Sequence, residues 1–170
     1  QYRNEDVTEF PEHLKDKISL IKIDIRKKED VKKLIHEIKP DYVFHLAAQS
    51  LVTVSWKDPG VTLETNVLGT LNVLDAIREE GIHPTIEVAC SSAEYGTTYE
   101  NEVPTGENKA LRPTSVYAIS KVATDMLAEL YAKSYGMKIV RVRLFSISGP
   151  RKVSDFISDF AKGIVEVERG

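Results

Sequence analysis

Short apolar runs along the chain alternate with longer stretches in which apolar residues recur every three or four positions. The short runs are rich in β-branched residues and predict strands at residues 18–25, 41–48, 85–90 and 138–145. The longer stretches predict helices at residues 30–38, 58–81, 115–136 and 154–168. Strands that alternate with helices indicate a parallel sheet covered on both faces. The pattern therefore predicts an α/β fold built on a doubly wound parallel sheet.

Turn-forming residues mark the ends of these elements. Asp58 followed by Pro59 is typical of the N-cap and first turn of a helix. Thr114 or Ser115 is expected to cap the longest helix. Residues 97–113 are polar and rich in turn formers, and they predict a surface loop.

The 170 residues include 23 basic and 26 acidic side chains, which gives a formal net charge of −3, and 42% of the residues are apolar. A chain of this kind can bury a sizeable core, as one domain or a large piece of one. The charge balance gives no basic footprint for nucleic acid, and no apolar run approaches the ~20 residues of a membrane helix. Cys90 is the sole cysteine, so no internal disulfide can form and a cytoplasmic location is expected.

Tyr117 and Lys121 are four residues apart near the start of the longest predicted helix, so they share one helix face. An ammonium beside a phenol favours the phenolate, which predicts a lowered pKa for Tyr117 and a general acid or base near neutral pH. Ser91 and Ser92 follow the strand predicted at residues 85–90, and ligands bind at the carboxyl ends of strands in open α/β sheets. A hydroxyl there can hydrogen-bond a substrate oxygen while the phenol exchanges its proton.

Several segments resemble the extended short-chain dehydrogenase/reductase family, which comprises nucleotide-sugar epimerases, dehydratases and reductases. They are residues 24–25 (DI), 45–48 (HLAA), 65–70 (TNVLGT), 91–96 (SSAEYG), 117–121 (YAISK) and 144–150 (LFSISGP). The segments follow the family's order and cover nearly the whole chain from about Ile18. The resemblance implies a Rossmann fold, a nucleotide-sugar substrate, and NADP or NAD as cofactor.

The same resemblance implies a role for each matched residue. Tyr117 is expected to be the catalytic acid or base, Lys121 to tune it and hold the nicotinamide ribose, and Ser91 to polarise the C4 oxygen of the sugar. The substrate is expected to contact Gln49 and Ser146, although the family commonly has Asn at the position of Ser146. The cofactor is expected to contact Tyr117, Lys121 and five residues at strand ends, namely Asp24, Ile25, Leu46, Ala47 and Ala48.

The turn after Ser91 bears on the kind of reaction. The family's dehydratases carry an acidic residue at the positions of Ser92 and Ala93, and neither is acidic here. Glu94 comes one residue later, and in an extended stretch one step turns a side chain to the other face. Ser92 and Glu94 are therefore possible further catalytic residues, and Glu94 can reach the site only if the turn bulges.

Two further segments favour one branch of the family. Residues 107–115 and 158–165 resemble GDP-4-keto-6-deoxymannose reductases, so the expected reaction is reduction of the C4 keto group of a GDP-6-deoxy-hexulose, with a GDP-sugar as the favoured substrate. The alternatives are a GDP-mannose 4,6-dehydratase, a nucleotide-sugar 4-epimerase and a non-catalytic cofactor-binding relative.

The family's Gly-rich phosphate turn does not occur upstream of Asp24. We therefore expect an incomplete doubly wound sheet, with a partial NAD(P)-binding domain at residues 1–150 and the start of the substrate-binding portion at residues 151–170. Arg3 and Asn4 resemble the tail of the family's second strand, where a basic residue favours the 2′-phosphate of NADP.

Other residues are expected to have structural roles. Asn66 is interpreted as a core amide that ties two loops together, and His45 as a core histidine. Arg143 could support the site from a neighbouring strand. No group of His, Cys, Asp and Glu has metal-ligand spacing, so no metal is expected. The resemblance implies a homodimer paired through the helices at residues 58–81 and 115–136. The composition and charge predict no membrane or nucleic-acid partner.

Overall fold

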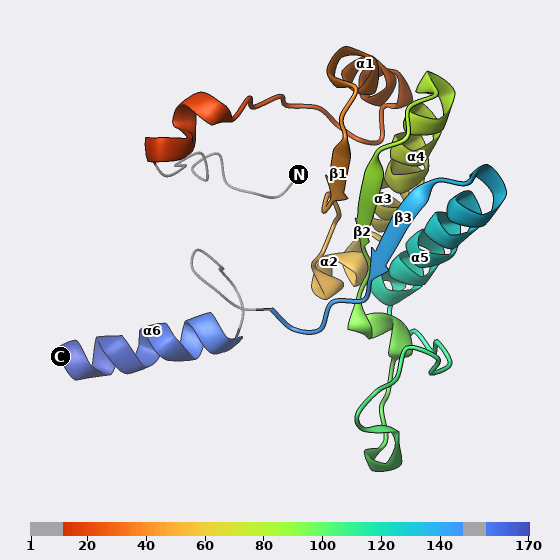
Figure 1. Ribbon diagram of the computed structural model, residues 1–170. Helices are drawn as coiled ribbons and strands as arrows, with labels where there is room; N and C mark the ends of the chain where they lie inside the picture. The colour runs from red at the N-terminus through yellow and green to blue at the C-terminus, as the bar shows by residue number, and fades with distance from the viewer. Residues whose placement is uncertain (1–11, 148–155) are drawn as a thin grey trace.

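Three parallel strands form the centre of the computed structural model, which describes residues 12–147 and 156–170 (Figure 1). The strands are β1 (Tyr42–His45), β2 (Thr85–Ala89) and β3 (Lys138–Val142). They pair in the order β1-β2-β3, with His45 opposite Val88 and Val88 opposite Arg141. The carboxyl ends of all three strands therefore lie at one edge of the sheet. The predicted α/β class and parallel sheet are confirmed.

Helices connect the strands, as the alternating pattern predicts. They are η1 (Glu12–Lys17), α1 (Lys28–Ile38), α2 (Val52–Lys57), α3 (Pro59–Leu63), η2 (Glu64–Leu68), α4 (Gly69–Glu80), η3 (Ser92–Tyr95), η4 (Glu100–Glu102), α5 (Val116–Tyr135) and α6 (Phe156–Arg169). The Ser115 hydroxyl caps α5 by accepting the backbone N–H of Ala118, and the Asp58 carboxylate caps α3 through the N–H of Val61. No helix within the described ranges is long and apolar enough to cross a bilayer.

The helix predicted at residues 58–81 is interrupted. Its middle turn, η2, is a π-helix, so α3 and α4 are separated by a wider turn that contains Asn66. π-Turns within α-helices often occur at functional sites. The short helices α2, η3 and η4 were not predicted, because segments of three to six residues are too short to show a helical period.

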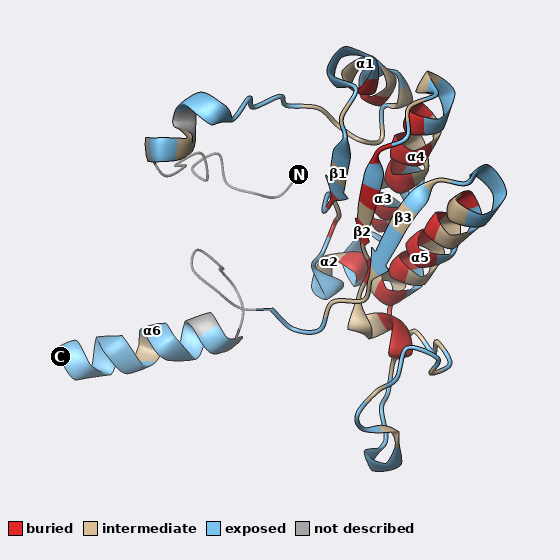
Figure 2. Cartoon of the chain, viewed as in Figure 1, coloured by how far each residue is buried: buried red, intermediate tan, exposed pale blue. Residues whose placement is uncertain are grey.

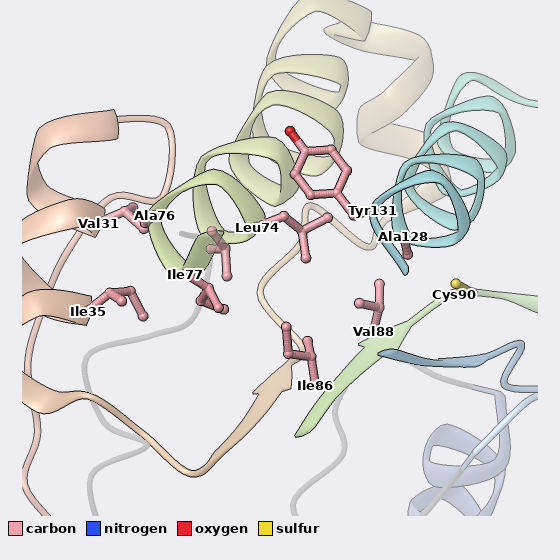
Figure 3. Packing of buried hydrophobic residues seen from close by; sticks show 11 residues of the cluster. Val31, Ile35, Leu74, Ala76, Ile77, Ile86, Val88, Cys90, Ala128 and Tyr131 are labelled. Atoms are coloured by element: carbon pink, nitrogen blue, oxygen red, sulfur yellow. The ribbon is translucent and has the colours of Figure 1, made fainter. Parts of the chain in front are cut away.

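The core lies between the sheet and the helices α4 and α5. Ile86 and Val88 of β2 are fully buried and point toward Leu74 and Ile77 of α4 (Figure 3). Ala128 of α5 closes the same cluster (Figure 3). This packing fixes the start of α5 against the end of β2, where the predicted catalytic residues lie.

The opposite face of the sheet is exposed, which corrects the expectation of helices on both faces. Tyr42 and Phe44 of β1 are 69% and 66% exposed, and Val140 of β3 is 53% exposed. Figure 2 shows this face of the strands as largely exposed, with the buried residues on the side of α4 and α5. Among the described elements, α1, α4 and α5 all lie on the one covered side (Figure 1).

The strand predicted at residues 18–25 does not form, which is a second correction. The segment is extended without strand pairing, although Ile23 and Ile25 pack against the core cluster. In a doubly wound sheet, the strand at this place pairs only with the second strand of the fold, and the described ranges contain no such strand. Arg3, Asn4 and the expected domain boundary at 150–151 lie outside the described residues.

Candidate active site

The residues predicted to be catalytic converge where β2 ends and α5 begins. Ser91 lies two residues beyond the end of β2, and Tyr117 and Lys121 lie on the first two turns of α5. The Ser91 side chain lies close enough to the Tyr117 phenol to act on its pKa by hydrogen bonding. The Lys121 ammonium is buried and donates to the Ala89 carbonyl oxygen at 2.6 Å. The three side chains therefore form one group at the carboxyl edge of the sheet.

The electrostatics of Tyr117 differ from the expectation. Burial raises the pKa of Tyr117, and the negative charge of Glu94 raises it further, whereas the hydrogen bond with Ser91 opposes the shift. The Lys121 ammonium is directed at the Ala89 carbonyl oxygen. Burial lowers the pKa of Lys121 itself. The expected lowering of the Tyr117 pKa is therefore wrong, and the phenol is held in its protonated form.

A tight turn holds Ser91 in place. The Ser91 hydroxyl accepts the backbone N–H of Ala93 at 3.2 Å, and the Ser91 N–H donates to Glu94 Oε1 at 2.8 Å. These reciprocal bonds form a capping box at the start of η3. The half-buried Ser92 donates its backbone N–H to the Leu144 carbonyl oxygen, which joins the turn to the segment after β3.

Glu94 lies behind the catalytic group. The turn is a 3₁₀-helix and not an extended strand, so the alternation of faces on which the sequence argument relied does not apply. The Glu94 side chain is completely buried, and Oε2 lies 3.3 Å from Nε of Arg143. The carboxyl group therefore faces the protein interior, away from a substrate.

Arg143 and Asp125 complete this buried cluster. Arg143 Nε donates to Asp125 Oδ2 at 2.7 Å, and its guanidinium also reaches the hydroxyl of Tyr95. Arg141 pairs with the other oxygen of Asp125. Burial disfavours the charge on Asp125, but the hydrogen bonds from Arg143 and Arg141 outweigh it and lower the pKa of that carboxyl. The sequence reading did not identify Asp125, although it follows Lys121 by four residues and shares its helix face.

Three buried side chains in this cluster could in principle ligate a metal. The ligand atoms of Cys90, Glu94 and Asp125 all lie within 4.8 Å of one another. The guanidinium of Arg143 already lies against both carboxyl groups, and burial raises the pKa of Cys90 to about 12. A thiol that keeps its proton is a poor metal ligand, and a cation is repelled by the arginine. The chemistry of this donor set therefore favours ion pairing over metal binding.

Asn66 connects the loop after β1 to α5. Its side chain is 1% exposed, accepts the Gln49 N–H at 2.7 Å and donates to the Ser120 hydroxyl at 2.8 Å. Ser120 in turn donates to the carbonyl oxygen of Tyr117. The interpretation of Asn66 as a core amide is confirmed, although it ties a loop to a helix and not two loops together. The π-turn allows this role because it places Asn66 in the interior.

Two residues were expected to contact the substrate. The Gln49 side chain is buried and bonds to protein groups, donating to the Thr62 hydroxyl of α3 and accepting the N–H of Leu51 in its own loop. This arrangement gives Gln49 a structural function. Ser146 lies exposed in the segment after β3, on the same edge of the sheet as Ser91.

The residues expected to hold a cofactor lie at the carboxyl edge of β1 and in the segment before α1. Leu46 and Ala47 are exposed directly after β1, and Ala48 is half-buried. The small side chains of Ala47 and Ala48 leave the strand end open to a planar ligand. Ile25 packs closely on Gly69, because a Cβ added at Gly69 would lie 2.5 Å from Cδ1 of Ile25. These features fit a dinucleotide lying across the end of the sheet.

The Asp24 carboxylate has a protein partner on this side. It accepts the backbone N–H and the guanidinium of Arg26, with a shortest distance of 2.6 Å. Asn72 of α4 supports the same turn by donating to the carbonyl oxygen of Ile25 at 2.9 Å. Asn72 was not identified from the sequence, because a polar residue on a helix gives no sign of its partner.

Comparisons with known proteins give a consistent set of similar sequences. The family model described as GDP-mannose 4,6 dehydratase matches residues 2–170. A GDP-mannose 4,6-dehydratase of Vibrio cholerae is 32% identical over 150 residues, which cover 86% of this chain and 40% of that protein. A GDP-6-deoxy-D-mannose reductase of Pseudomonas aeruginosa is 34% identical over 132 residues, covering 77% of this chain and 43% of the relative.

Two solved structures share the fold. RMD from Pseudomonas aeruginosa, complexed with NADPH, has a TM-score of 0.82 and 32% identity, and the match covers 88% of this chain and 51% of that one. The UDP-glucose 4-epimerase of Thermus thermophilus, in complex with NAD, has a TM-score of 0.78 and 36% identity. That match covers 86% of this chain and 47% of the epimerase chain. The chain spans less than half the length of the curated relatives it matches.

Proposed function

The chain belongs to the GDP-mannose 4,6-dehydratase family, and on that premise we propose that the protein reduces the C4 keto group of a GDP-linked 6-deoxy-hexulose with NADPH or NADH. Ser91, Tyr117 and Lys121 are the residues proposed to carry the reaction. Their convergence at the carboxyl edge of the sheet supports an enzyme over a non-catalytic relative, because packing alone does not require all three side chains there.

The burial of Glu94 is the observation that favours reduction over dehydration. Elimination of water across C5 and C6 of the sugar needs an acid or base that reaches those carbons. In the serine turn, Ala93 has no ionisable group, and the Glu94 carboxyl is completely buried and bonded to the Ser91 N–H. Besides the hydride of a nicotinamide cofactor, reduction needs only a proton donor and an oxygen-binding group, which this turn and α5 can supply.

Each proposed catalytic side chain has a distinct task. A nicotinamide cofactor supplies the hydride when bound. Tyr117 holds the proton on its phenol, as its raised pKa favours, and donates it to the C4 oxygen of the sugar. Ser91 donates a hydrogen bond to the same oxygen, and the buried Lys121 charge stabilises the phenolate that remains. Lys121, Leu46 and Ala47 are proposed to hold the cofactor.

The proposal is tested with the purified protein, GDP-4-keto-6-deoxymannose and NADPH or NADH, by following the absorbance of the reduced nicotinamide. Oxidation that Tyr117→Phe abolishes supports a reductase with Tyr117 as its acid. Tyr135→Phe is the matched control, because Tyr135 is exposed at the far end of the same helix.

Other results would identify a different reaction. Conversion of GDP-mannose to a keto sugar without oxidation of NADPH would identify a dehydratase. Inversion at C4 of a nucleotide sugar without net oxidation would identify an epimerase. Cofactor binding without turnover of any of these substrates would contradict the enzymatic proposal.

The proposed assembly is a homodimer formed through the helices at residues 58–81 and 115–136. Ile119, Met126 and Leu130 of α5 support it, because these apolar side chains are 44% to 54% exposed. Light scattering of Met126→Asp against the unchanged protein tests the pairing. A dimer that persists in the variant would contradict this interface.

A further inference from the structure

The carboxyl group of Glu94 lies where three elements meet, enclosed on every side. The titratable and charged groups around it are Asp125, Tyr117 and Lys121 of α5, Arg143 after β3, Cys90 at the end of β2, and Arg141 beyond Asp125. A buried carboxylate is stable only when opposite charges and hydrogen bonds compensate it. The distribution of these partners therefore decides which carboxyl group is ionised.

The two carboxyl groups are compensated unequally. Asp125 forms ion pairs with both Arg141 and Arg143, whereas among the described residues Glu94 forms an ion pair with Arg143 alone. Arg143 Nε has one proton, and it lies 2.7 Å from Asp125 Oδ2 but 3.3 Å from Glu94 Oε2. Glu94 Oε1 accepts the Ser91 N–H, and among the described side chains Oε2 is a buried oxygen left without a hydrogen-bond partner.

A proton on Glu94 Oε2 would give this buried oxygen a hydrogen-bond partner and remove one of two adjacent negative charges. The protonated oxygen can donate to the ionised Asp125, because carboxylate oxygens of Glu94 and Asp125 lie within 4.8 Å of each other. Oε1 keeps its bond to Ser91, and only one net negative charge is left between the two arginines. Two carboxyl groups this close commonly share one proton.

We propose that Glu94 is a positioning residue, which keeps a proton on Oε2, donates it to Asp125, and holds the turn that presents Ser91 to Tyr117. The inference deepens the proposed function and rests on it for its catalytic consequence. Loss of that proton to solvent leaves two adjacent buried carboxylates. The second charge strains the Ser91 turn and opposes formation of the Tyr117 phenolate, because both negative charges lie close together.

The first test measures the proton without any substrate. The δ-carbon of Glu94 is followed by NMR over a pH series in the purified protein labelled with ¹³C-glutamate, and its signal is assigned from its absence in Glu94→Gln. Burial and the neighbouring Asp125 raise the pKa of Glu94 to about 7, so the resonance is expected to titrate near neutrality. Titration near pH 4 would overturn the inference.

The second test compares the pH dependence of kcat in the reductase assay. Glu94→Gln mimics the protonated acid, because its amide accepts from Ser91 and donates to Asp125. At pH 6 the kcat of Glu94→Gln is expected to lie within about threefold of that of the unchanged protein. As the pH rises through 7, kcat is expected to fall in the unchanged protein but not in Glu94→Gln. Glu94→Ala is expected to lower kcat about tenfold or more at every pH, because the serine turn loses its anchor.

Glu102→Gln is the matched control. Glu102 accepts the N–H of Tyr99 in a second capping box, in the loop far from the site, so its pH profile is expected to be unchanged. A fall through pH 7 that persists in Glu94→Gln would overturn the inference, and so would equal losses in Glu94→Gln and Glu94→Ala. Titration of Glu94 near pH 7 without any sugar reduction would contradict the proposed function and still support the shared proton.

Discussion

Lys121 Nζ donates to the carbonyl oxygen of Ala89 at 2.6 Å, and this bond joins the second turn of α5 to the last residue of β2. Ser91 lies two residues beyond Ala89, and Tyr117 lies one helical turn before Lys121. The bond therefore fixes the distance between the serine turn and the tyrosine. The Lys121 ammonium therefore positions the serine turn and the tyrosine in addition to contributing its charge to the site.

Replacement of this lysine should affect catalysis more than stability. Lys121→Met is expected to lower kcat/KM by about 100-fold or more, because the site loses a buried cation and donor. The positive charge of Lys121 adds to burial in lowering the pKa of His45. The His45 pKa should therefore be higher in Lys121→Met, and NMR of the imidazole measures it. Lys133→Met, on the exposed face of the same helix, is expected to change neither quantity. An unchanged His45 pKa in Lys121→Met would contradict the assigned electrostatics.

Asn66 is expected to be essential for stability. Asn66→Ala leaves the N–H and carbonyl of Gln49 and the hydroxyl of Ser120 without their partner, all of them buried. Unmade buried hydrogen bonds cost about 1–3 kcal/mol each, so a loss of about 3 kcal/mol in the free energy of unfolding is expected. Urea denaturation measures it, with the exposed Asn101→Ala as the control. A loss below about 1 kcal/mol would show that water or a neighbour replaces the amide.

The sequence predicts features that depend on local pattern. Runs of β-branched residues identify β1, β2 and β3, and the four-residue spacing of Tyr117 and Lys121 places both on one face of α5. The position of Ser91 after a strand is sufficient to bring it to the same edge of the sheet. These predictions succeed because each depends on one element and on the general behaviour of parallel sheets.

Features that depend on distant partners could not be predicted in this way. The segment at residues 18–25 has the pattern of a strand but no neighbouring strand within the described ranges. The direction of Glu94 depends on a 3₁₀-turn, and the partners of Asp125 come from β3 and the residue after it. No periodicity in the sequence reports contacts between elements so far apart along the chain.

Gly96 is expected to tolerate no side chain. Its φ is +64°, and a Cβ would lie 1.8 Å from the backbone oxygen of Arg112, where the loop returns toward η3. Gly96→Ala should therefore cost at least about 2 kcal/mol in the free energy of unfolding, and it should lower kcat by displacing the serine turn. Gly106→Ala, in the same loop with no atom within 4 Å of its Cβ, should change stability by less than about 0.5 kcal/mol. Equal effects of the two variants would contradict this close approach.

His45 makes the stability of the protein depend on pH. Its ring is buried, and the Thr70 hydroxyl donates to the Asn66 carbonyl oxygen, so Thr70 accepts the proton of His45 Nε2 and the imidazole is neutral. Burial and the charge of Lys121 lower the pKa of His45 to about 4 from an ordinary value of 6.5. The unfolded chain therefore binds a proton as the pH falls below 6.5, whereas the folded chain does not until about pH 4.

The contribution of His45 is thus fully present above pH 6.5 and is lost as the pH falls toward 4, by about 3 kcal/mol over that window. His45→Gln keeps a donor for Thr70 but cannot titrate, so its stability relative to the unchanged protein should improve between pH 7 and pH 4.5 in urea denaturation. His83→Gln, at an exposed position, should show no such trend. Glu94 titrates with the opposite sign, since its raised pKa weakens folding as the pH rises, but it is common to both proteins and cancels in the difference. The two proteins are compared by their free energies of unfolding between pH 7 and pH 4.5. If the difference stays constant over this range, the folded chain accepts the proton on His45 and the prediction is contradicted.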